Sequence, residues 1–449
     1  MAFEVQLVHS FRLVSSTFGG LLQEPVVPPS PVAGLLLELH AAAIVTTVTM
    51  VVARSAITFP PVLMSDGTIV ERKGSMAPSR VSFSDQVVTE AKRLGFDAVA
   101  IADAREPIEQ DVARYESFVD AGMHGAMSWL ATPENARART RLDGDEILEG
   151  ARSIVCVARR YPRDAENGEV SRSIARYARG RDYHKFLRKR LRRLATFIRS
   201  IGAPDGPLRE RVHARPLLDE EPILERAWAA RAGLGFVGKN GMLIVPGAGS
   251  MFMLGEVVTT LELRPTGRPS LASLTGEAER CGSCTRCLDA CPTGAFVRPF
   301  VLDPRRCISY LTIELQQRGA IPVEMRESIG THLFGCDDCQ TVCPFNASAG
   351  ARASTESVDG DPFAPLARWS LVRLEELLSI DDATWDEWSE GSPLRRAGRA
   401  GLARNAAIVL GNRGEASALP ALQKAAAHHE DATVRETARW AIQRIQQKE

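Results

Sequence analysis

The chain has 449 residues, of which 45% are hydrophobic, and its 55 basic side chains balance 55 acidic ones. This length exceeds what one hydrophobic core normally organises, so we expect two or three domains, and the balanced charge excludes a global field that would by itself indicate a nucleic-acid partner. Eight of the nine cysteines fall between Cys281 and Cys343, which excludes a secreted disulfide scaffold and indicates metal binding in a reducing compartment, the cytoplasm.

The first 75 residues lack the pattern of the rest. Leu35–Val52 is mostly apolar, but Glu38 and His40 interrupt it, and the remaining run is shorter than the roughly 18 residues that a membrane span needs. We therefore expect no membrane segment. Residues 1–75 are interpreted as a disordered or mis-annotated extension, with the natural start at Met76.

Helical and strand patterns alternate from residue 76 to about residue 270. In chain order they predict a helix from Ser82, a strand at Ala98–Ala102, a strand at Val155–Val157, a basic helical segment at Arg176–Ile201, a helix at Glu225–Ala232, and strands at Met242–Val245 and Phe252–Leu261. The alternation predicts one α/β domain over residues 76–270.

Two clusters of basic residues flank the cysteines. Nine basic residues and one acid, Asp182, lie between Arg176 and Arg193. The second cluster consists of Arg395, Arg396, Arg399, Arg404 and Arg413. Either cluster alone is typical of a solvated helix face, but two of them favour an RNA partner bound through its phosphates.

The cysteines form two runs, which place a ferredoxin-like domain at residues 271–350. The first has the spacing C-x2-C-x2-C-x3-C followed by proline, which is typical of bacterial two-cluster ferredoxins, and the second lacks its first cysteine, which Cys307 can replace. A pair of zinc sites is the alternative. Cys156 lies in an apolar run and receives no role. By ferredoxin topology we assign one four-iron, four-sulfur cluster to Cys281, Cys284, Cys287 and Cys343, and the other to Cys291, Cys307, Cys336 and Cys339.

Beyond a polar linker at residues 351–362, the pattern is almost entirely helical. The stretches ARNAAIVLGN and VRETARWAIQ superpose with a shift of about 31 residues, which aligns Ala407 with Ala438. This short period predicts HEAT-like helix pairs over residues 363–449.

Four stretches resemble epoxyqueuosine reductases, from about Met76 to the C-terminus: SIARYARGRDYHKFLRKRL, RPLLDEEPILERAWAARAGLGFVGKN, CISYLTIE and LFGCDDCQTVCPFN. The resemblance implies a multidomain α+β protein with a cobalamin-binding α/β domain similar to that of reductive dehalogenases, then the ferredoxin-like and HEAT-like parts. It also implies reduction of the epoxide of epoxyqueuosine in the tRNA anticodon loop, with electrons passing from two clusters to cobalamin.

The resemblance implies a proton donor at Asp219, just before the motif that reads PILER here. An apolar pocket would raise the pKa of this carboxyl and keep it protonated near neutrality. The alternative is an ordinary helix N-cap. Glu220 and Glu221 follow where the family pattern has small residues, which puts the local electrostatics in question.

The resemblance also suggests cobalamin contacts beyond Asp219, each with a simpler alternative such as a solvated charge or core packing. These residues are Arg137, Tyr177, Leu243, Ile244, Val245, Leu254 and Tyr310. The partners implied are a tRNA anticodon stem-loop and an external electron donor, and we expect a monomer. A related reductive dehalogenase, or an electron carrier fused to a helical scaffold, remains the alternative function.

Overall fold

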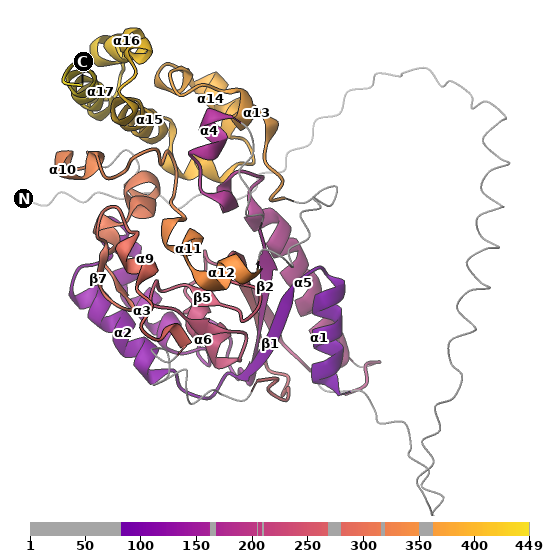
Figure 1. Cartoon of the computed structure of the whole chain (residues 1–449). Helices are drawn as coiled ribbons and strands as arrows, with labels where there is room; N and C mark the ends of the chain where they lie inside the picture. The colour runs from indigo at the N-terminus through magenta and orange to yellow at the C-terminus, as the bar shows by residue number, and fades with distance from the viewer. Residues whose placement is uncertain are drawn as a thin grey trace, which may run out of the picture. The chain divides into compact units, whose positions relative to one another are not determined.

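The computed structural model describes residues 82–161, 168–203, 205–208, 211–267, 280–315, 319–349 and 362–448, which lie in one compact unit, Arg80–Glu449 (Figure 1). The predictions for residues 1–75, including the apolar segment, and for the linker at 351–361 lie outside the described residues. No helix within the described ranges is both long enough and apolar enough to cross a membrane.

A four-stranded sheet forms the centre of the first part of the chain. Its order is β1 (Ala98–Asp103), β2 (Ser153–Arg160), β6 (Phe252–Thr259) and β3 (Ala214–Leu217). Every neighbouring pair of strands is antiparallel. Helices and strands therefore occur together in this part of the chain as predicted, but the sheet is not the parallel sheet of an α/β domain. The two central strands are buried along most of their length, and their nearly continuous apolar runs resemble those of parallel strands.

Two helices cover one face of the sheet. The first, α1 (Phe83–Arg93), begins where predicted, and its N-cap is Ser82, whose hydroxyl accepts from the backbone of Asp85. The second, α5 (Tyr183–Ile201), presents a buried apolar stripe to β6, where a side chain at Gly255 would lie 2.9 Å from Leu191 Cδ1. This helix begins later than predicted, because Asp182 caps it and Arg176–Ala178 forms a separate 3-10 turn, η2.

The other face carries α6 (Glu225–Arg231), with residues of α3 (Pro133–Thr140) in the same apolar core. Cys156 is fully buried there, as a small apolar residue. The remaining elements of this part are α2 (Glu109–Asp120), η1 (Ser128–Ala131), α4 (Glu169–Arg172), β4 (Phe236–Val237) and β5 (Leu243–Ile244).

The cysteine-bearing segment is built from short elements with little core of its own. These elements are α9 (Arg286–Asp289), the hairpin β7 (Phe296–Arg298) and β8 (Val301–Leu302), η3 (Pro304–Arg306), the π-helical turn η4 (Tyr310–Glu314), α10 (Val323–Arg326), α11 (Asp338–Thr341) and α12 (Pro344–Ala349). Such short elements depend on contacts with the neighbouring parts of the chain for their positions.

The C-terminal part is helical, as predicted. Its elements are α13 (Ala367–Leu371), η6 (Glu376–Leu378), α14 (Asp382–Ser389), η7 (Pro393–Ala397), α15 (Arg399–Arg413), η8 (Ala416–Ala418), α16 (Leu419–His428) and α17 (Ala432–Gln446). The aligned alanines, Ala407 and Ala438, are both fully buried where α15 packs on α17. Val170 and Phe334 belong to the same core as these helices, so residues from all three predicted parts share it.

Two buried polar side chains of α15 fasten this helix to the cysteine-bearing segment. The Arg404 guanidinium donates to the carbonyl oxygens of Gly319, at 2.9 Å, and Leu311, at 3.1 Å. Asn405 Nδ2 donates to the carbonyl oxygens of Thr312, at 2.8 Å, and Leu333, at 3.0 Å. Burial lowers the pKa of Arg404 to about 10, so this side chain remains charged at neutral pH.

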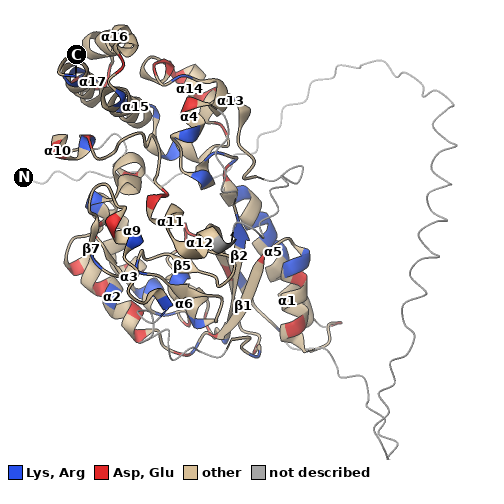
Figure 2. Ribbon diagram, in the orientation of Figure 1, with Lys and Arg blue, Asp and Glu red and all other residues tan. Residues whose placement is uncertain are grey.

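The second predicted basic surface is wrong. Arg404 is buried, and the other four arginines of that cluster pair with acids of neighbouring elements. Their partners are Asp386 for Arg395, Glu314 for Arg396, Asp382 and Glu430 for Arg399, and Glu169 for Arg413. These arginines join helices together, whereas Figure 2 shows a dense run of basic residues along α5.

Replacing Arg404 tests the fastening of α15. Arg404→Leu keeps most of the buried volume but leaves two carbonyl groups without their donor, which should cost roughly 3 kcal/mol. We expect the thermal unfolding midpoint, measured by circular dichroism, to fall by several degrees. Arg439→Leu, at an exposed position of α17, is the matched control and should leave the midpoint unchanged. Equal midpoints for the two variants would contradict the structural role of Arg404.

Candidate functional site

Asp219 lies in the turn after β3 and receives two side-chain hydrogen-bond donors from the start of α5. The Tyr183 hydroxyl donates to Oδ2, and His184 Nε2 lies 3.1 Å from Oδ1. The Asp219 side chain is 38% exposed, so the predicted apolar pocket is wrong. The N-cap alternative is wrong as well, because Leu224 occupies the N-cap of α6.

His184 lies between two carboxylates. Its Nδ1 is 2.6 Å from Asp182 Oδ1, and its ring stacks on Tyr183 with the centroids 4.2 Å apart. Burial alone would lower the pKa of His184, but the hydrogen bonds to Asp182 and Asp219 outweigh it and raise the pKa to about 9. The imidazole is therefore protonated at neutral pH, and both ring nitrogens can donate.

The glutamates that depart from the family pattern have a basic neighbour. Arg188, one turn after His184 on α5, forms an ion pair with Glu220, and its Nη2 lies 3.8 Å from Glu221 Oε1. Glu221 Oε2 also accepts a hydrogen bond of 2.7 Å from the backbone of Leu218, which holds the turn that carries Asp219. The extra negative charge is thus largely balanced beside Asp219.

Two further acids extend the site into the core. Burial raises the pKa of Glu225, at the start of α6, to about 7, and the charge of Asp219 adds to this effect. Glu256 of β6 is fully buried, and burial raises its pKa well above the usual range. Neither carboxyl oxygen of Glu256, nor the indole nitrogen of Trp228 on α6, has a hydrogen-bond partner among the described residues. A buried polar atom without a partner in the chain points to a bound water, ion or ligand.

The remaining residues predicted to bind cobalamin separate into several places. Leu243, Val245 and Leu254 pack into the core on the α6 side of the sheet, and strand alternation places Leu254 on the same face as Glu256. Tyr177 contacts the ring of Tyr183 edge-on, with the centroids 6.1 Å apart.

Three other predicted residues lie elsewhere. Arg137 is exposed on α3 and pairs with Glu146 at 2.7 Å. The hydroxyl of Tyr310 accepts from the backbone of Ala126 at 2.7 Å, within a different core group. Ile244 faces the cysteines described next.

A cavity of about 270 Å³ lies among the four cysteines that the sequence assigns to the first cluster: Cys281, Cys284, Cys287 and Cys343. Ile244 and Phe345 contribute apolar wall to this cavity. The Lys239 ammonium donates to the carbonyl oxygens of Gly282, at 2.6 Å, and Cys284, at 3.0 Å, which fixes the loop. Closely spaced thiols around a small cavity suit a four-iron, four-sulfur cube.

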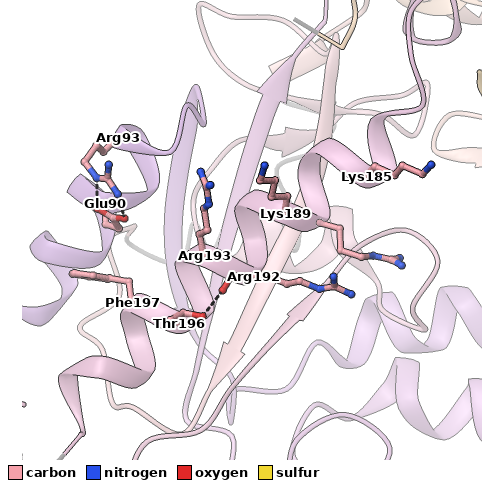
Figure 3. A pocket seen from close by; sticks show the side chains of 9 residues that line it. Glu90, Arg93, Lys185, Lys189, Arg192, Arg193, Thr196 and Phe197 are labelled. Atoms are coloured by element: carbon pink, nitrogen blue, oxygen red, sulfur yellow. Dashed lines mark hydrogen bonds and ion pairs between the residues drawn. The ribbon is translucent and has the colours of Figure 1, made fainter. Parts of the chain in front are cut away.

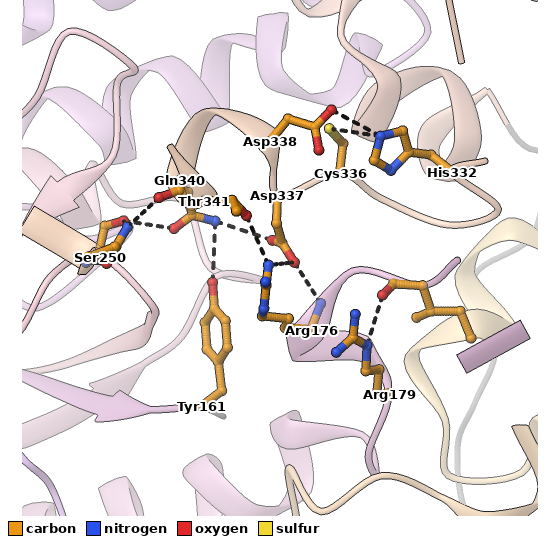
Figure 4. Close-up of polar contacts among 12 residues, drawn as sticks. Tyr161, Arg176, Arg179, Ser250, His332, Cys336, Asp337, Asp338, Gln340 and Thr341 are labelled. Carbon is orange, nitrogen blue, oxygen red and sulfur yellow. Dashed lines mark hydrogen bonds and ion pairs between the residues drawn. The ribbon is translucent and has the colours of Figure 1, made fainter. Parts of the chain in front are cut away.

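The cysteines of the second set are all partly buried. Burial raises the pKa values of Cys336 and Cys339, and neighbouring thiols including Cys307 raise them further. As thiolates, these side chains would repel one another unless a metal supplied positive charge. His332 Nε2 lies 3.0 Å from Asp338 Oδ2 and 3.9 Å from Cys336 Sγ (Figure 4).

A polar network connects this second set with the sheet (Figure 4). Arg176 donates its backbone N–H to Asp337 Oδ2 at 2.8 Å. The Gln340 side chain contacts both Tyr161, at 3.4 Å, and Ser250, at 2.9 Å. These bonds hold the loop that carries Cys336 and Cys339 against the part of the chain that carries Asp219.

The sequence reasoning missed Tyr183, His184, Glu225 and Glu256 as parts of the site. Tyr183 and His184 lie in the quoted stretch RDYH, but they meet Asp219 across 36 and 35 residues, which no local pattern reveals. The sequence could have indicated a role for Glu256, because this glutamate lies within the apolar run of β6 and glutamate is almost never fully buried without a partner.

Comparison with known proteins identifies two family models and several close relatives. A model described as a 4Fe-4S double cluster binding domain matches residues 280–346, and a model described as epoxyqueuosine reductase QueG matches residues 141–216. An epoxyqueuosine reductase of Xanthomonas campestris is 38% identical over 372 residues, which cover 81% of this chain and 97% of the relative. One of Gloeobacter violaceus is 40% identical and covers 76% and 99%.

Solved structures of epoxyqueuosine reductases are also similar to this chain. A crystal structure of an epoxyqueuosine reductase with an epoxyqueuosine-modified tRNA-Tyr stem loop superposes with a TM-score of 0.67 and 31% identity, covering 80% of this chain and 89% of the other. A Bacillus subtilis epoxyqueuosine reductase gives a TM-score of 0.66 and 32% identity, with coverage of 80% and 90%.

The pKa of His184 gives a test that needs no substrate. Asp219→Asn removes one of the two carboxylates that raise this pKa, so we expect it to fall from about 9 toward the usual value for histidine. The rate of hydrogen–deuterium exchange at the imidazole C2 position, followed against pH by mass spectrometry, reports each histidine separately. His332, which pairs with Asp338, is the internal control. An unchanged His184 pKa in the variant would show that Asp219 and His184 do not interact.

Proposed function

This chain belongs to the epoxyqueuosine reductase family, and from that premise we propose that it reduces the epoxide of epoxyqueuosine to queuosine at the wobble position of tRNA, the last step of queuosine synthesis. The observation that carries the proposal is the similarity along nearly the full length of named relatives, at 38% identity, joined to a solved neighbour that holds the modified stem loop. The chain is thus an oxidoreductase that acts on tRNA.

The reaction fixes what the site must supply. Opening the epoxide and forming the carbon–carbon double bond consumes two electrons and two protons and releases the oxygen as water. Iron-sulfur clusters deliver electrons one at a time, and cobalamin, when bound, supplies a reduced cobalt centre that can act on the epoxide carbon. The chain itself must provide protons at the departing oxygen, because an alkoxide is a poor leaving group.

We propose that Asp219 delivers these protons and His184 resupplies it. The Tyr183 hydroxyl and His184 both contact the Asp219 carboxyl group, and His184 holds a proton on Nε2 at 3.1 Å from Oδ1. When the epoxide oxygen reaches Asp219, this proton can pass from Nε2 to Oδ1 and on to the oxygen. Tyr183 orients the carboxylate through Oδ2. Hydrogen-bond distance between donor and acceptor is the geometric requirement for such a transfer.

We propose the two cysteine sets as the ligands of two four-iron, four-sulfur clusters. All eight cysteines lie within residues 280–346, where the double-cluster family model matches. The cavity among the first set and the electrostatic coupling within the second support the crossed assignment, Cys281, Cys284, Cys287 and Cys343 against Cys291, Cys307, Cys336 and Cys339.

We propose that cobalamin binds on the α6 side of the sheet. Leu243, Val245 and Leu254 would contact its apolar surface, and Glu256 and Trp228, whose buried polar atoms have no partner among the described residues, would bind its polar rim. The residues present therefore fit such a group. Tyr177 lies beside Tyr183 at the edge of this region, whereas Arg137, Ile244 and Tyr310 are less direct candidates.

We propose that the chain has three domains with different roles. Residues 76–270, 271–350 and 363–449 would form the cobalamin-binding, ferredoxin-like and HEAT-like parts. The packing of α15 and α16 on α17 supports the helical repeat. We propose a cytoplasmic monomer that receives electrons from an external donor, since the queuosine reaction itself supplies none.

Turnover is the direct test of this function. Anaerobically purified protein with cobalamin and a reductant should convert epoxyqueuosine to queuosine in tRNA, seen by mass spectrometry as loss of one oxygen from the nucleoside. Asp219→Ala should lower the rate by about a hundredfold or more, because one general acid contributes on that order. Iron content and cobalamin binding should not change in this variant. Unchanged substrate with fully loaded wild-type protein would refute the function, and normal turnover by Asp219→Ala would refute the proton donor.

The cluster assignment has its own test. Cys307→Ser removes a ligand of the second cluster only, so iron and sulfide in the purified protein should fall to about half, since each cube carries four of each. Cys156→Ser is the control, because Cys156 lies in the sheet core, and it should retain full iron content. Stoichiometric zinc in place of iron in the wild-type protein would overturn the cluster proposal.

A further inference from the structure

The solvent face of α5 and the end of α1 form an open basic groove of about 930 Å³ (Figure 3). Its charged residues are Lys185, Arg188, Lys189, Arg192 and Arg193 of α5, with Arg93 and Glu90 of α1. Figure 3 shows Arg93, Lys189 and Arg193 pointing to the same side. Six basic side chains therefore share one surface with a single acid.

Most of this positive charge is not neutralised within the protein. Glu90 pairs with Arg93 of its own helix at 2.6 Å. Lys185, Lys189, Arg192 and Arg193 are all exposed, and none forms an ion pair with a described residue. The arginines at the start of the C-terminal helices behave differently, since they are buried or paired. A solvated face that only keeps a helix soluble does not require four unpaired cations along one groove.

The groove runs directly from the candidate active site. The same helix begins with Tyr183 and His184, which contact Asp219, and its next turn carries Arg188, which pairs with Glu220. At about 1.5 Å per residue, the helix places Arg193 roughly 14 Å from His184 along its axis. This length spans several successive phosphates of a nucleic-acid strand whose modified base lies at Asp219.

We propose that this groove on α5 binds the tRNA backbone on one side of the modified nucleotide, with Lys185, Lys189, Arg192 and Arg193 each contacting phosphate oxygens. The inference rests on the proposed function and identifies the surface through which that substrate is held. Phosphate contacts fix the register of a nucleic acid without reading its sequence. The groove therefore positions the modified base, and the residues around Asp219 act on it.

Binding measured against salt concentration tests the groove. The substrate is an epoxyqueuosine-modified anticodon stem-loop, and the variant is the double substitution Lys189→Gln with Arg192→Gln in the full chain. Each lost phosphate contact should reduce the slope of log K against log salt by about 1, so the variant should lose about 2. Its dissociation constant at low salt should rise roughly tenfold.

The matched control is Lys424→Gln with Arg439→Gln, one lysine and one arginine exposed on α16 and α17. It removes the same charge and should leave both affinity and salt slope unchanged. Equal losses in both double variants would show a general charge effect and overturn the groove, as would wild-type affinity and slope in the α5 variant. Failure of the proposed function can be distinguished from failure of the groove proposal, because it would appear as absence of turnover by the wild-type protein.

Discussion

The packing of α5 on the central strand β6 is the contact on which the site depends. Gly255 lets Leu191 approach the sheet closely, and the buried stripe of α5 then fixes the rotation of the helix about its axis. Given that rotation, Tyr183 and His184 meet Asp219 at one end, while the basic residues face solvent. A single helix orientation thereby sets both the contacts of Asp219, the proposed proton donor, and the charged surface.

Buried polar contacts hold the cysteine-bearing segment in place together with apolar contacts of residues such as Ile308 and Leu311. Its elements are short, and Arg404 and Asn405 reach it from α15 while the side chains of Gln340 and Asp337 tie it to the sheet. Each of these groups is buried, so leaving any of them unpaired is costly. Such bonds are directional, and they therefore fix the positions of the cysteine loops relative to Asp219 more closely than an apolar contact of similar size would.

The elements with strong local signals could be predicted, and the contacts between them could not. Ser82 and the apolar spacing after it predicted α1, and the cysteine spacing indicated two metal clusters before any geometry was known. The antiparallel sheet was not foreseen, because strands buried on both faces read alike in either direction. The apolar pocket for Asp219 was wrong because the surrounding apolar residues, such as Leu218, turn inward, while Tyr183 and His184 arrive from a distant helix.

The two basic clusters also show that local sequence does not reveal contacts between distant elements. The run around Arg395 and the run on α5 look alike in sequence, since both are rich in basic residues with few acids nearby. In the fold, acids from distant elements neutralise the first run: Glu314 reaches Arg396 across 82 residues, and Glu169 reaches Arg413. On the solvent face of α5, Lys185, Lys189, Arg192 and Arg193 have no ion-pair partner among the described residues, whereas Arg188 pairs with Glu220. Local charge density thus indicates a nucleic-acid surface only where the tertiary structure leaves the charge unpaired, and α5 meets that condition beside Asp219, the proposed proton donor.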